Sequence, residues 1–380
     1  MKILFLHSSS DAYGSGKILY YIVRFLHNAG HECYVILPEN GPLSDELKYL
    51  GAEVTIEELG ILRRKYYTVK GIFNRIVSLF RAVVKIRRYI AGNGIEIVYS
   101  NTTAVMAGAI ASRLTRKKHI WHVHEIIAKP RLLAVFLAFM LKYFSDKVVV
   151  VSQAVYDHWN YICPMQDKLT LIYNGLDAAE FHNVRTTKIR TELGLPTDTP
   201  LIGMVGRVHY WKGQDYFLKI ANIIHNYSKD VRFIMVGDPF PGYEYLLDIH
   251  IRLKKEYDLE NACFDLGYRT DVMQIMASLD IFVLPSTLPD PLPTVVLEAM
   301  FSGKPVVATA HGGATEMVVD GQTGILIPWD NAEMAFAKMK PLIDSSLLCH
   351  KMGEQGRVRA EQNYSLKTFE ENIQKLLINV

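Results

Sequence analysis

Cysteines are few in this sequence, and long apolar segments are absent. The four cysteines among its 380 residues lie far apart and form no Cys-x-x-Cys pair and no zinc-like grouping with histidine; they are Cys33, Cys163, Cys263 and Cys349. This spacing excludes a disulfide scaffold and predicts free thiols in a reducing compartment. The longest apolar run, Leu132–Leu141, has ten residues, which is about half of what a membrane-spanning helix requires. We therefore expect no segment that spans a bilayer.

The composition excludes a disordered or collagenous chain. Lys plus Arg total 42 against 39 Asp plus Glu, and 49% of the residues are hydrophobic, which is typical of a globular protein. At about 100 to 200 residues per domain, the length predicts two domains. Only four apolar residues, Ile3–Leu6, precede the first polar stretch, fewer than the about 7 to 15 in the core of a signal peptide. We therefore expect a cytoplasmic protein.

Acidic residues are missing from one basic segment. Residues 60–90 hold nine Lys and Arg side chains and five aromatic ones, with no Asp or Glu. Residues 1–170 have 22 basic against 13 acidic residues, a net charge of +9, and the remainder has 20 against 26, a net charge of −6. Such a segment can contact anionic lipid, an anionic substrate or nucleic acid, or it can be a solvated helix face over a core. Among these alternatives we expect peripheral contact with an anionic membrane surface, and no nucleic-acid partner.

Short β-branched or apolar runs alternate with helical patterns along the whole chain, which predicts parallel sheets built from βαβ units. The expected strands lie at 2–6, 32–37, 95–99, 119–123, 147–151, 201–205, 231–236, 262–266, 280–284 and 305–308. The predicted fold class is α/β, with two doubly wound Rossmann-like domains that face each other across a cleft. Ligands bind outside the carboxyl ends of strands in such sheets, so we expect the chemistry in that cleft.

Turn-forming residues are concentrated between 174 and 200, which predicts the domain boundary there. We assign residues 1–175 to an N-terminal domain and 176–362 to a C-terminal domain. Residues 363–380 form a predicted helix with one apolar face, which we expect to pack back on the N-terminal domain.

Two glycines, Gly14 and Gly16, follow the first predicted strand and precede a helical pattern. Glycines at a helix N-terminus let the backbone approach an anion. A P-loop is excluded, because Asp11 stands at its first glycine position and Ile18 stands where Ser or Thr must hold magnesium. A dinucleotide fingerprint fails because its third glycine is Leu19. The loop is therefore either an anion-binding loop or only a tight turn.

A second glycine-containing segment, Gly206–Gly213, directly follows the strand predicted at 201–205. Gly206 lets the chain leave the sheet. Arg207 and Lys212 can clamp a diphosphate, the guanidinium as a fork and the ammonium as a point charge. The alternative is a pair of exposed cations, but strand ends are where ligands bind in such folds. We therefore favour the diphosphate.

A proline-rich loop leads into a helix in the second half of the chain. Pro293 suits the first position of a helix, so the amides of Thr294 and Val295 would begin it and favour an anion. Thr294 and Glu298 share a helix face about 6 Å apart along the axis, which fits a phosphate and a ribose. Asp290, in the loop before the helix, would then face the third part of the ligand.

These segments resemble the retaining glycosyltransferases of family 4, which have the two-domain GT-B fold, and among them the bacterial surface-polysaccharide type. The family's Gly-Arg-x4-Lys-Gly motif matches Gly206–Gly213, and its Glu-x7-Glu motif matches the spacing of Asp290 and Glu298. Other segments that resemble the family are 151–152, 173–177, 237–239, 266–269 and 312–316. The resemblance covers nearly the whole chain and is strongest from Asn174 onward.

The resemblance implies a role for each motif residue. The expected catalytic residues are His124, Arg207, Lys212 and Asp290, of which Arg207 and Lys212 would hold the donor diphosphate and Asp290 the donor sugar. The expected donor-binding residues are Gly14, Gly16, Gly206, Gly267, Tyr268, Arg269, Thr294, Val295 and Glu298. Within that set, Glu298 would bind the ribose and residues 267–269 would border the nucleobase.

Three further points concern individual motif positions. His124, at a strand end, falls on the family's cleft histidine. Asp290 is one methylene shorter than the family's glutamate, and Pro293 replaces its usual glycine. The contact of Asp290 with the sugar can therefore differ from that in the family.

The resemblance implies transfer of a hexosyl group from a UDP-sugar or GDP-sugar to an acceptor hydroxyl, with retention of configuration. Residues 1–175 would bind the acceptor, which we expect to be a lipid-linked saccharide at the inner face of a membrane, and 176–362 the donor. The sequence has no Asp-x-Asp motif, so we expect neither a metal nor another cofactor. The alternatives are an epimerase or a phosphorylase of the same fold, and a non-catalytic module that binds nucleic acid through residues 60–90.

Overall fold

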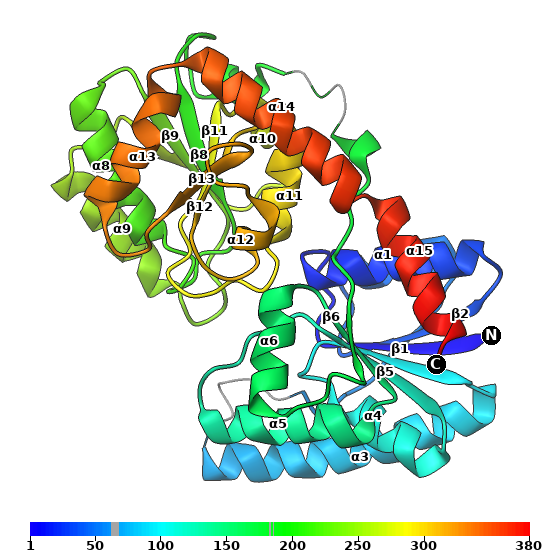
Figure 1. The fold of residues 1–380 in the computed structure, drawn as a ribbon. Helices are drawn as coiled ribbons and strands as arrows, with labels where there is room; N and C mark the ends of the chain where they lie inside the picture. The colour runs from blue at the N-terminus through cyan, green and yellow to red at the C-terminus, as the bar shows by residue number, and fades with distance from the viewer. Residues whose placement is uncertain (62–67, 182–183, 185) are drawn as a thin grey trace. The chain divides into compact units, whose positions relative to one another are not determined.

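A computed structural model describes residues 1–61, 68–181, 184 and 186–380. The chain divides into two compact units: unit 1 comprises Met1–Gly175 with Phe369–Val380, and unit 2 comprises Leu176–Thr368. Each unit is a parallel sheet with helices on both faces (Figure 1). The predicted α/β class with two doubly wound Rossmann-like units is confirmed.

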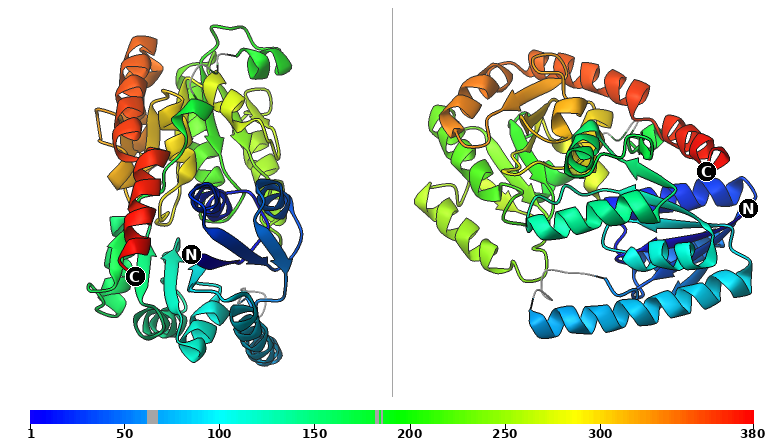
Figure 2. Two further views of the ribbon diagram at one scale, coloured as in Figure 1. Left: turned by 90° about the vertical axis from the view of Figure 1, so that its right-hand side faces the viewer. Right: turned by 60° about the horizontal axis from the view of Figure 1, so that its bottom comes forward.

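Unit 1 has a seven-stranded sheet in the order β3-β2-β1-β4-β5-β6-β7. Its strands are β1 (Lys2–His7), β2 (Glu32–Leu37), β3 (Glu53–Ile56), β4 (Ile97–Asn101), β5 (Lys118–Val123), β6 (Lys147–Val150) and β7 (Leu169–Leu171). Its helices are α1 (Ser15–Asn28), α2 (Pro42–Leu50), α3 (Val69–Asn93), α4 (Met106–Thr115), α5 (Arg131–Phe144), α6 (Gln153–Ile162) and α15 (Leu366–Ile378). Helices α1 and α2 cover one face of the sheet, and α3, α4 and α5 cover the other (Figure 2).

Unit 2 has a six-stranded sheet in the order β10-β9-β8-β11-β12-β13. Its strands are β8 (Leu201–Val205), β9 (Arg232–Val236), β10 (Cys263–Asp265), β11 (Ile281–Leu284), β12 (Val306–Thr309) and β13 (Gly324–Ile327). Its helices are a 3-10 turn (Ala178–Glu180), α7 (Lys188–Glu192), α8 (Gln214–Tyr227), α9 (Tyr245–Glu256), α10 (Val272–Ser278), α11 (Thr294–Phe301), α12 (Ala314–Met317), α13 (Ala332–Ile343) and α14 (Ser346–Asn363).

The strand order of both sheets reverses beside the first strand of each unit. In unit 1, β1 pairs with β2 on one side and β4 on the other, and in unit 2, β8 pairs with β9 and β11. The loops that leave these strands therefore diverge to opposite faces and open a crevice at the carboxyl edge of the sheet. The predicted loops 14–16 and 206–213 lie at these two places.

Three strands were not predicted, namely β3, β7 and β13. Each lies at the edge of its sheet, where one side of the strand has no partner strand to bury it. β3 has no buried residue at all, and β7 has only one. β3 and β7 therefore lack the continuous apolar run from which the central strands were predicted. β13 has a short apolar run, Ile325–Ile327, but only its two end residues, Gly324 and Ile327, are buried.

Helix α15 packs on unit 1, and its apolar side chains Phe369, Ile373, Leu376 and Leu377 are buried. Unit 2 extends to Thr368, six residues beyond the predicted boundary at 362. The residues that follow α14 pair with Leu176, the first residue of unit 2, and therefore stay with that unit. There the Leu176 amide donates to the Tyr364 carbonyl and the Leu366 amide to the Leu176 carbonyl. The acceptor and donor roles assigned to the two domains stay predictions.

Among the described residues, no helix has the length and apolar character needed to cross a membrane.

Candidate functional site

The predicted residues Lys212 and Asp290 meet at the carboxyl edge of the unit 2 sheet. Lys212 lies in the loop after β8 and Asp290 in the loop after β11, and these two strands pair. The Lys212 Nζ donates to Asp290 Oδ2 over 2.5 Å. The two side chains are 18% and 10% exposed, so the pair is partly withdrawn from water, where its attraction exceeds that of a surface ion pair.

The loop that carries Lys212 is fixed by a glycine. Gly213 has φ +81°, and a Cβ there would lie 1.9 Å from the carbonyl oxygen of Pro285. The Thr287 amide donates to the Trp211 carbonyl over 2.8 Å. The loop after β8 therefore rests directly on the loop after β11, which only glycine permits at this position.

The backbone of Asp290 is held from its other side by the turn after β12. The Gly313 amide donates to the Asp290 carbonyl over 2.8 Å. Gly312 has φ +63°, and a Cβ there would lie 2.4 Å from the Asp290 carbonyl oxygen. Asp290 is thus clamped between two loops, which orients its carboxylate toward Lys212.

Both predicted cations of this loop lie against aromatic rings. The guanidinium of Arg207 is 5.6 Å from the centroid of the Phe240 ring, and Lys212 Nζ is 4.4 Å from that of Trp211. Cations at these distances are attracted by the ring quadrupole. Sequence reasoning did not single out Phe240, which lies in the loop after the neighbouring strand β9.

Helix α11 begins at Thr294, with Pro293 as its N-cap. Val295 follows in the first turn and Glu298 one turn later, and both are partly buried. The neighbours of Glu298 on either side, Leu297 and Ala299, are fully buried. The Val296 amide donates to the Pro293 carbonyl over 3.0 Å. The amides of Thr294 and Val295 have no carbonyl partner within the helix, so this end of α11 favours an anion.

Glycines end three neighbouring strands of unit 2. The Gly206 amide donates to the Val236 carbonyl over 2.9 Å, and the Gly237 amide donates to the Gly267 carbonyl over 2.8 Å. A cavity of about 280 Å³ lies beside them, lined in part by Gly206, Gly237, Asp238, His250, Asp265 and Gly267. Burial lowers the pKa of His250, so this imidazole is neutral at pH 7. Sequence reasoning missed His250 and Asp265, since they lie on α9 and β10, outside the motifs.

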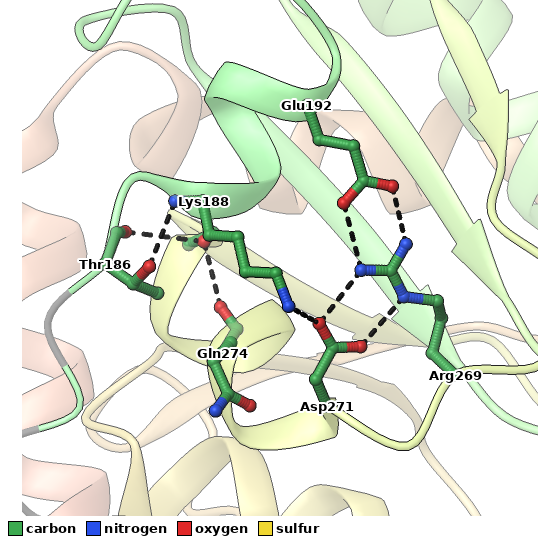
Figure 3. Close-up of polar contacts among 7 residues, drawn as sticks. Thr186, Lys188, Glu192, Arg269, Asp271 and Gln274 are labelled. Carbon is green, nitrogen blue, oxygen red and sulfur yellow. Dashed lines mark hydrogen bonds and ion pairs between the residues drawn. The ribbon is translucent and has the colours of Figure 1, made fainter.

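The predicted nucleobase segment, residues 267–269, contains two large side chains, Tyr268 and Arg269. Tyr268 is half exposed. The Arg269 guanidinium lies between two carboxylates (Figure 3): it donates to Asp271 over 2.8 and 2.9 Å and to Glu192 over 2.6 and 3.0 Å. Lys188 donates to the same Asp271 carboxylate over 2.8 Å.

The hydrogen bonds from Arg269 hold the pKa of Asp271 far below its usual range, and those with Asp271 and Glu192 raise the pKa of Arg269. These four hydrogen bonds engage four of the five guanidinium N–H groups, so one remains for any further contact. Arg269 therefore anchors the loop that presents Gly267 and Tyr268. A direct contact between Arg269 and a nucleobase stays a prediction.

In unit 1, Asn101 connects the two places that the sequence singled out. His124 Nε2 lies 2.8 Å from Asn101 Oδ1, and Asn101 Nδ2 donates to the carbonyl of Ser15, between Gly14 and Gly16, over 3.0 Å. Asn101 ends β4, which pairs with both β1 and β5. It was missed because a single asparagine after a strand forms no pattern.

The glycines of that first loop have different tasks. Gly14 has φ +44° and precedes α1, a conformation that favours glycine. A Cβ on Gly16 would lie 2.1 Å from the carbonyl oxygen of Asp11. Both glycines are thus explained by the turn itself, and their contact with phosphate stays a prediction.

Burial makes the histidines of unit 1 poor bases. His122 is fully buried, its Nδ1 lies 3.0 Å from the Tyr99 hydroxyl, and burial lowers its pKa to about 3. The His124 ring is 4.1 Å from that of His122, and burial lowers the pKa of His124 well below its usual value. His124 is therefore neutral at pH 7, so that one ring nitrogen can donate to Asn101 while the other accepts.

Glu125, next to His124, is a partly buried group to which sequence reasoning gave no role. Its carboxylate oxygens accept from the amides of Thr103, each over 3.2 Å, and of His124 over 3.0 Å. Burial raises its pKa to about 7. Glu125 thereby joins the loops after β4 and β5 and fixes the backbone of His124.

Among the residues that the structure describes, no three His, Cys, Asp or Glu side chains are grouped as a metal site requires.

Two doubly wound units, with a clamped lysine–carboxylate pair at the sheet edge of the second, are the architecture of the GT-B glycosyltransferases. The family model of the glycosyl transferases group 1 matches residues 185–359, and that of glycosyltransferase family 4 matches residues 13–180. Together they cover most of the chain. The chain belongs to the GT-B glycosyltransferases of the family 4 type.

Named relatives agree with this assignment. The chain is 26% identical to the UDP-Gal:alpha-D-GlcNAc-diphosphoundecaprenol alpha-1,3-galactosyltransferase of Escherichia coli, over 94% of this chain and 91% of that one. Crystal structures of Anabaena Alr3699/HepE with UDP and with UDP-glucose match it at TM-scores of 0.85 and 0.86, each with 25% identity and complete coverage of both chains. The protein is a glycosyltransferase that uses a nucleotide sugar. Neither the family models nor these relatives support the alternative of an epimerase.

Proposed function

We propose that this glycosyltransferase moves a hexosyl group from a UDP-sugar to a hydroxyl of a lipid-linked saccharide, with retention of configuration and without a divalent metal. The observation that carries the proposal is the clamped pair of Lys212 and Asp290 at the carboxyl edge of the unit 2 sheet. A cation and a carboxylate held side by side can bind the two parts of a sugar diphosphate, the cation the diphosphate and the carboxylate the sugar hydroxyls.

In the proposed reaction, the bond between the anomeric carbon and the diphosphate oxygen breaks while the acceptor oxygen bonds to that carbon. Negative charge then grows on the departing diphosphate. Lys212 and Arg207, with the first-turn amides of α11, stabilise that charge, because preorganised donors act without a cost of reorganisation. The departing oxygen takes the proton of the acceptor hydroxyl from the same face, which gives retention.

The two carboxylates have separate roles in this scheme. Asp290 accepts hydrogen bonds from hydroxyls of the donor sugar while it orients Lys212. Glu298, one helical turn after Thr294, accepts from the ribose hydroxyls. We assign the nucleobase to the cavity beside Gly206 and Gly267, next to the half-exposed Tyr268.

His124 has a proposed orienting role in unit 1. Its neutral ring can donate to or accept from a hydroxyl without introducing charge, and Asn101 and Glu125 fix the position of the ring and its backbone. A histidine orients reacting groups best when its tautomer is fixed by such a partner.

Two observations support the UDP-sugar and the lipid-linked acceptor. The Escherichia coli relative acts, by its name, from UDP-Gal on a saccharide linked to diphosphoundecaprenol, and Alr3699/HepE binds UDP and UDP-glucose. The basic segment 60–90 is the expected contact with the anionic membrane that holds such an acceptor. Of that segment, residues 62–67, with Arg63, Arg64 and Lys65, lie outside the described residues.

The described part of the basic segment is partly neutralised by acidic residues from outside it. Arg75 lies 3.3 Å from Glu58, and Lys85 lies 2.5 Å from Glu57. Charge alone is therefore a weaker attraction to lipid than the sequence count predicts. The contact with membrane and the absence of a nucleic-acid partner both stay proposals.

The experiment that tests the proposed function compares acceptors and metals in one assay. Release of UDP from UDP-sugars is measured with a diphospholipid-linked saccharide, with the same saccharide free, and with excess EDTA. We expect release that requires the lipid-linked acceptor and persists in EDTA. Equal release with water alone, or loss in EDTA with recovery in Mn²⁺, contradicts the acceptor or the metal-free mechanism respectively.

A further inference from the structure

Helix α5 exposes one apolar face. Its inner side chains, which include Leu137, Ala138 and Leu141, are buried against unit 1. The outer face has five large apolar side chains at spacings of three and four residues, and all are exposed: Leu132, Val135, Phe136, Phe139 and Tyr143. Leu132 is 86% exposed and Phe139 50%. A helix that is apolar all round is normally buried on all sides, so this outer face calls for a partner.

Helix α3 has a second exposed apolar stripe. Phe73, Ile76 and Phe80 are spaced three and four residues apart, so they share one face of the helix, and Phe73 and Phe80 are 69% and 70% exposed. They lie in the first half of this 25-residue helix. Ala82, Val83 and Ile86, which follow, belong to the buried core of unit 1.

The two stripes lie in one layer of unit 1. α3 and α5 cover the same face of the sheet, and α4 packs against both (Figures 1 and 2). Each helix follows a parallel strand, β3 or β5, and so begins at the carboxyl edge of the sheet. The exposed residues of α3 and the first turns of α5 therefore lie toward the edge at which His124 and the Gly14–Gly16 loop are found.

All charged side chains on these two helices are basic, although Glu58 and Glu57 from outside α3 pair with its Arg75 and Lys85. Neither α3 nor the whole stretch 126–145 contains an Asp or Glu. Exposed cations lie on both helices or at their ends, namely Arg81, Arg87, Arg88, Lys129 and Arg131. Apolar side chains that project between exposed cations complement a bilayer surface with anionic headgroups above hydrocarbon.

We propose that α5 and the first half of α3 form a membrane-docking surface whose apolar side chains enter the boundary between headgroups and acyl chains of an anionic bilayer. This surface is distinct from simple adsorption of the basic segment, because attachment then depends on apolar side chains of α5, outside residues 60–90. The inference rests on the proposed lipid-linked acceptor for its purpose. Docking would bring the carboxyl edge of the unit 1 sheet, where the acceptor is proposed to bind, to the membrane that holds such an acceptor.

A second copy of the chain is a poorer occupant of this surface. In a twofold contact each patch meets itself, so the exposed cations of α3 and α5 on one copy would face those of the other. The nearby carboxylates Glu57 and Glu58 already pair with Lys85 and Arg75. Like charges at contact distance oppose association. An anionic headgroup layer offers the opposite charge.

Vesicle flotation without donor or acceptor tests this surface. Vesicles of phosphatidylcholine alone and with phosphatidylglycerol are mixed with the wild type and with Phe136→Glu/Phe139→Glu, at low salt and at about 1 M salt, where the Debye length is about 3 Å. The control is Tyr49→Glu/Leu347→Glu, which adds the same charge at residues that are 97% and 79% exposed on α2 and α14. Thermal unfolding verifies that all variants fold.

We expect the wild type and the control to float with anionic vesicles and to keep part of this binding at high salt, because insertion of apolar groups is not screened. Phe136→Glu/Phe139→Glu should bind about tenfold or more weakly, since burial of each aromatic side chain is lost. Equal flotation of that variant and the wild type overturns the proposal. The proposal is also overturned if the wild type is a dimer and the variant is a monomer, because the apolar face would then join two copies of the chain. A failure of transfer with intact flotation would instead count against the proposed function alone.

Discussion

The ammonium of Lys212 donates a 2.5 Å hydrogen bond to the carboxylate of Asp290, and this bond joins the loops that follow the adjacent strands β8 and β11. Both side chains are largely buried. In the proposed mechanism, a diphosphate that binds Lys212 would meet a cation already held in place by a carboxylate, and that carboxylate would contact the donor sugar.

Lys212→Ala should leave the protein folded and lower kcat by about 10² to 10³, the usual effect of removing one preorganised donor to a developing anion. Lys219→Ala, at an exposed position on α8, is the matched control and should keep wild-type turnover. Steady-state release of UDP measures both. Wild-type turnover of a folded Lys212→Ala would remove this residue from the mechanism.

Glu298→Gln and Asp290→Asn should separate the two ends of the donor. Glu298→Gln should weaken binding of free UDP about tenfold, because one charged hydrogen bond to the ribose contributes about 1.5 to 3 kcal/mol. Asp290→Asn should largely spare free UDP, because the amide oxygen of Asn can still accept from Lys212, and should weaken binding of the intact UDP-sugar. Isothermal calorimetry with both ligands decides, and equal effects of the two substitutions on free UDP would refute separate roles.

Gly312→Ala should displace Asp290, because the new methyl would lie 2.4 Å from the Asp290 carbonyl oxygen. Gly321→Ala is the matched control: it also has a positive φ, +75° against +63°, but nothing lies within 4 Å of its Cβ. Both should lose about 1 to 2 kcal/mol of stability from the left-handed conformation. Gly312→Ala alone should also lose about 10² in kcat, the effect of a misplaced catalytic group. Equal activity of the two variants would show that the turn after β12 does not position Asp290.

Glu125 should make the stability of unit 1 fall as the pH rises. Its pKa is raised by burial to about 7 from a usual value near 4.5, so folding favours the protonated acid. The corresponding stability is complete below about pH 4.5 and is lost between there and about pH 7, and it amounts to about 3 kcal/mol.

The neutral variant Glu125→Gln tests this dependence. The difference in melting temperature, variant minus wild type, should rise from pH 4.5 to pH 7 and then level off. The buried histidines His7 and His122 are present in both proteins, so their titration cancels in this difference. A difference that is flat with pH would mean that Glu125 is ionised throughout.

The central strands and the contiguous motifs were the features best predicted from the sequence. The strand at 201–205 and the segment Gly206–Gly213 were predictable because one short stretch contains an apolar run, a glycine and two cations. Lys212 pairs with Asp290, 78 residues later, because their strands are neighbours in the sheet. Local sequence patterns do not predict the order of strands in a sheet, so this pairing could not be predicted.

The missed residues share that cause. Asn101 reaches His124 and the carbonyl of Ser15 only because β4 lies between β1 and β5. Glu192, which was not predicted, accepts from Arg269 across 77 residues of sequence. The apolar run Leu132–Leu141 was visible in the sequence, but a continuous run does not show which face of a helix is buried, and that difference is the basis of the docking surface.

One measurement tests the central claim most directly: proton NMR of a reaction that contains the protein, a UDP-hexose and a diphospholipid-linked saccharide in detergent. The account predicts that the anomeric signal of the donor disappears at the rate at which a new glycosidic anomeric signal of the same configuration appears, and that both stop in Lys212→Ala. A new signal of the opposite configuration would contradict retention. Loss of the donor signal to free hexose at the same rate with and without acceptor would contradict the assignment as a transferase acting on a lipid-linked saccharide.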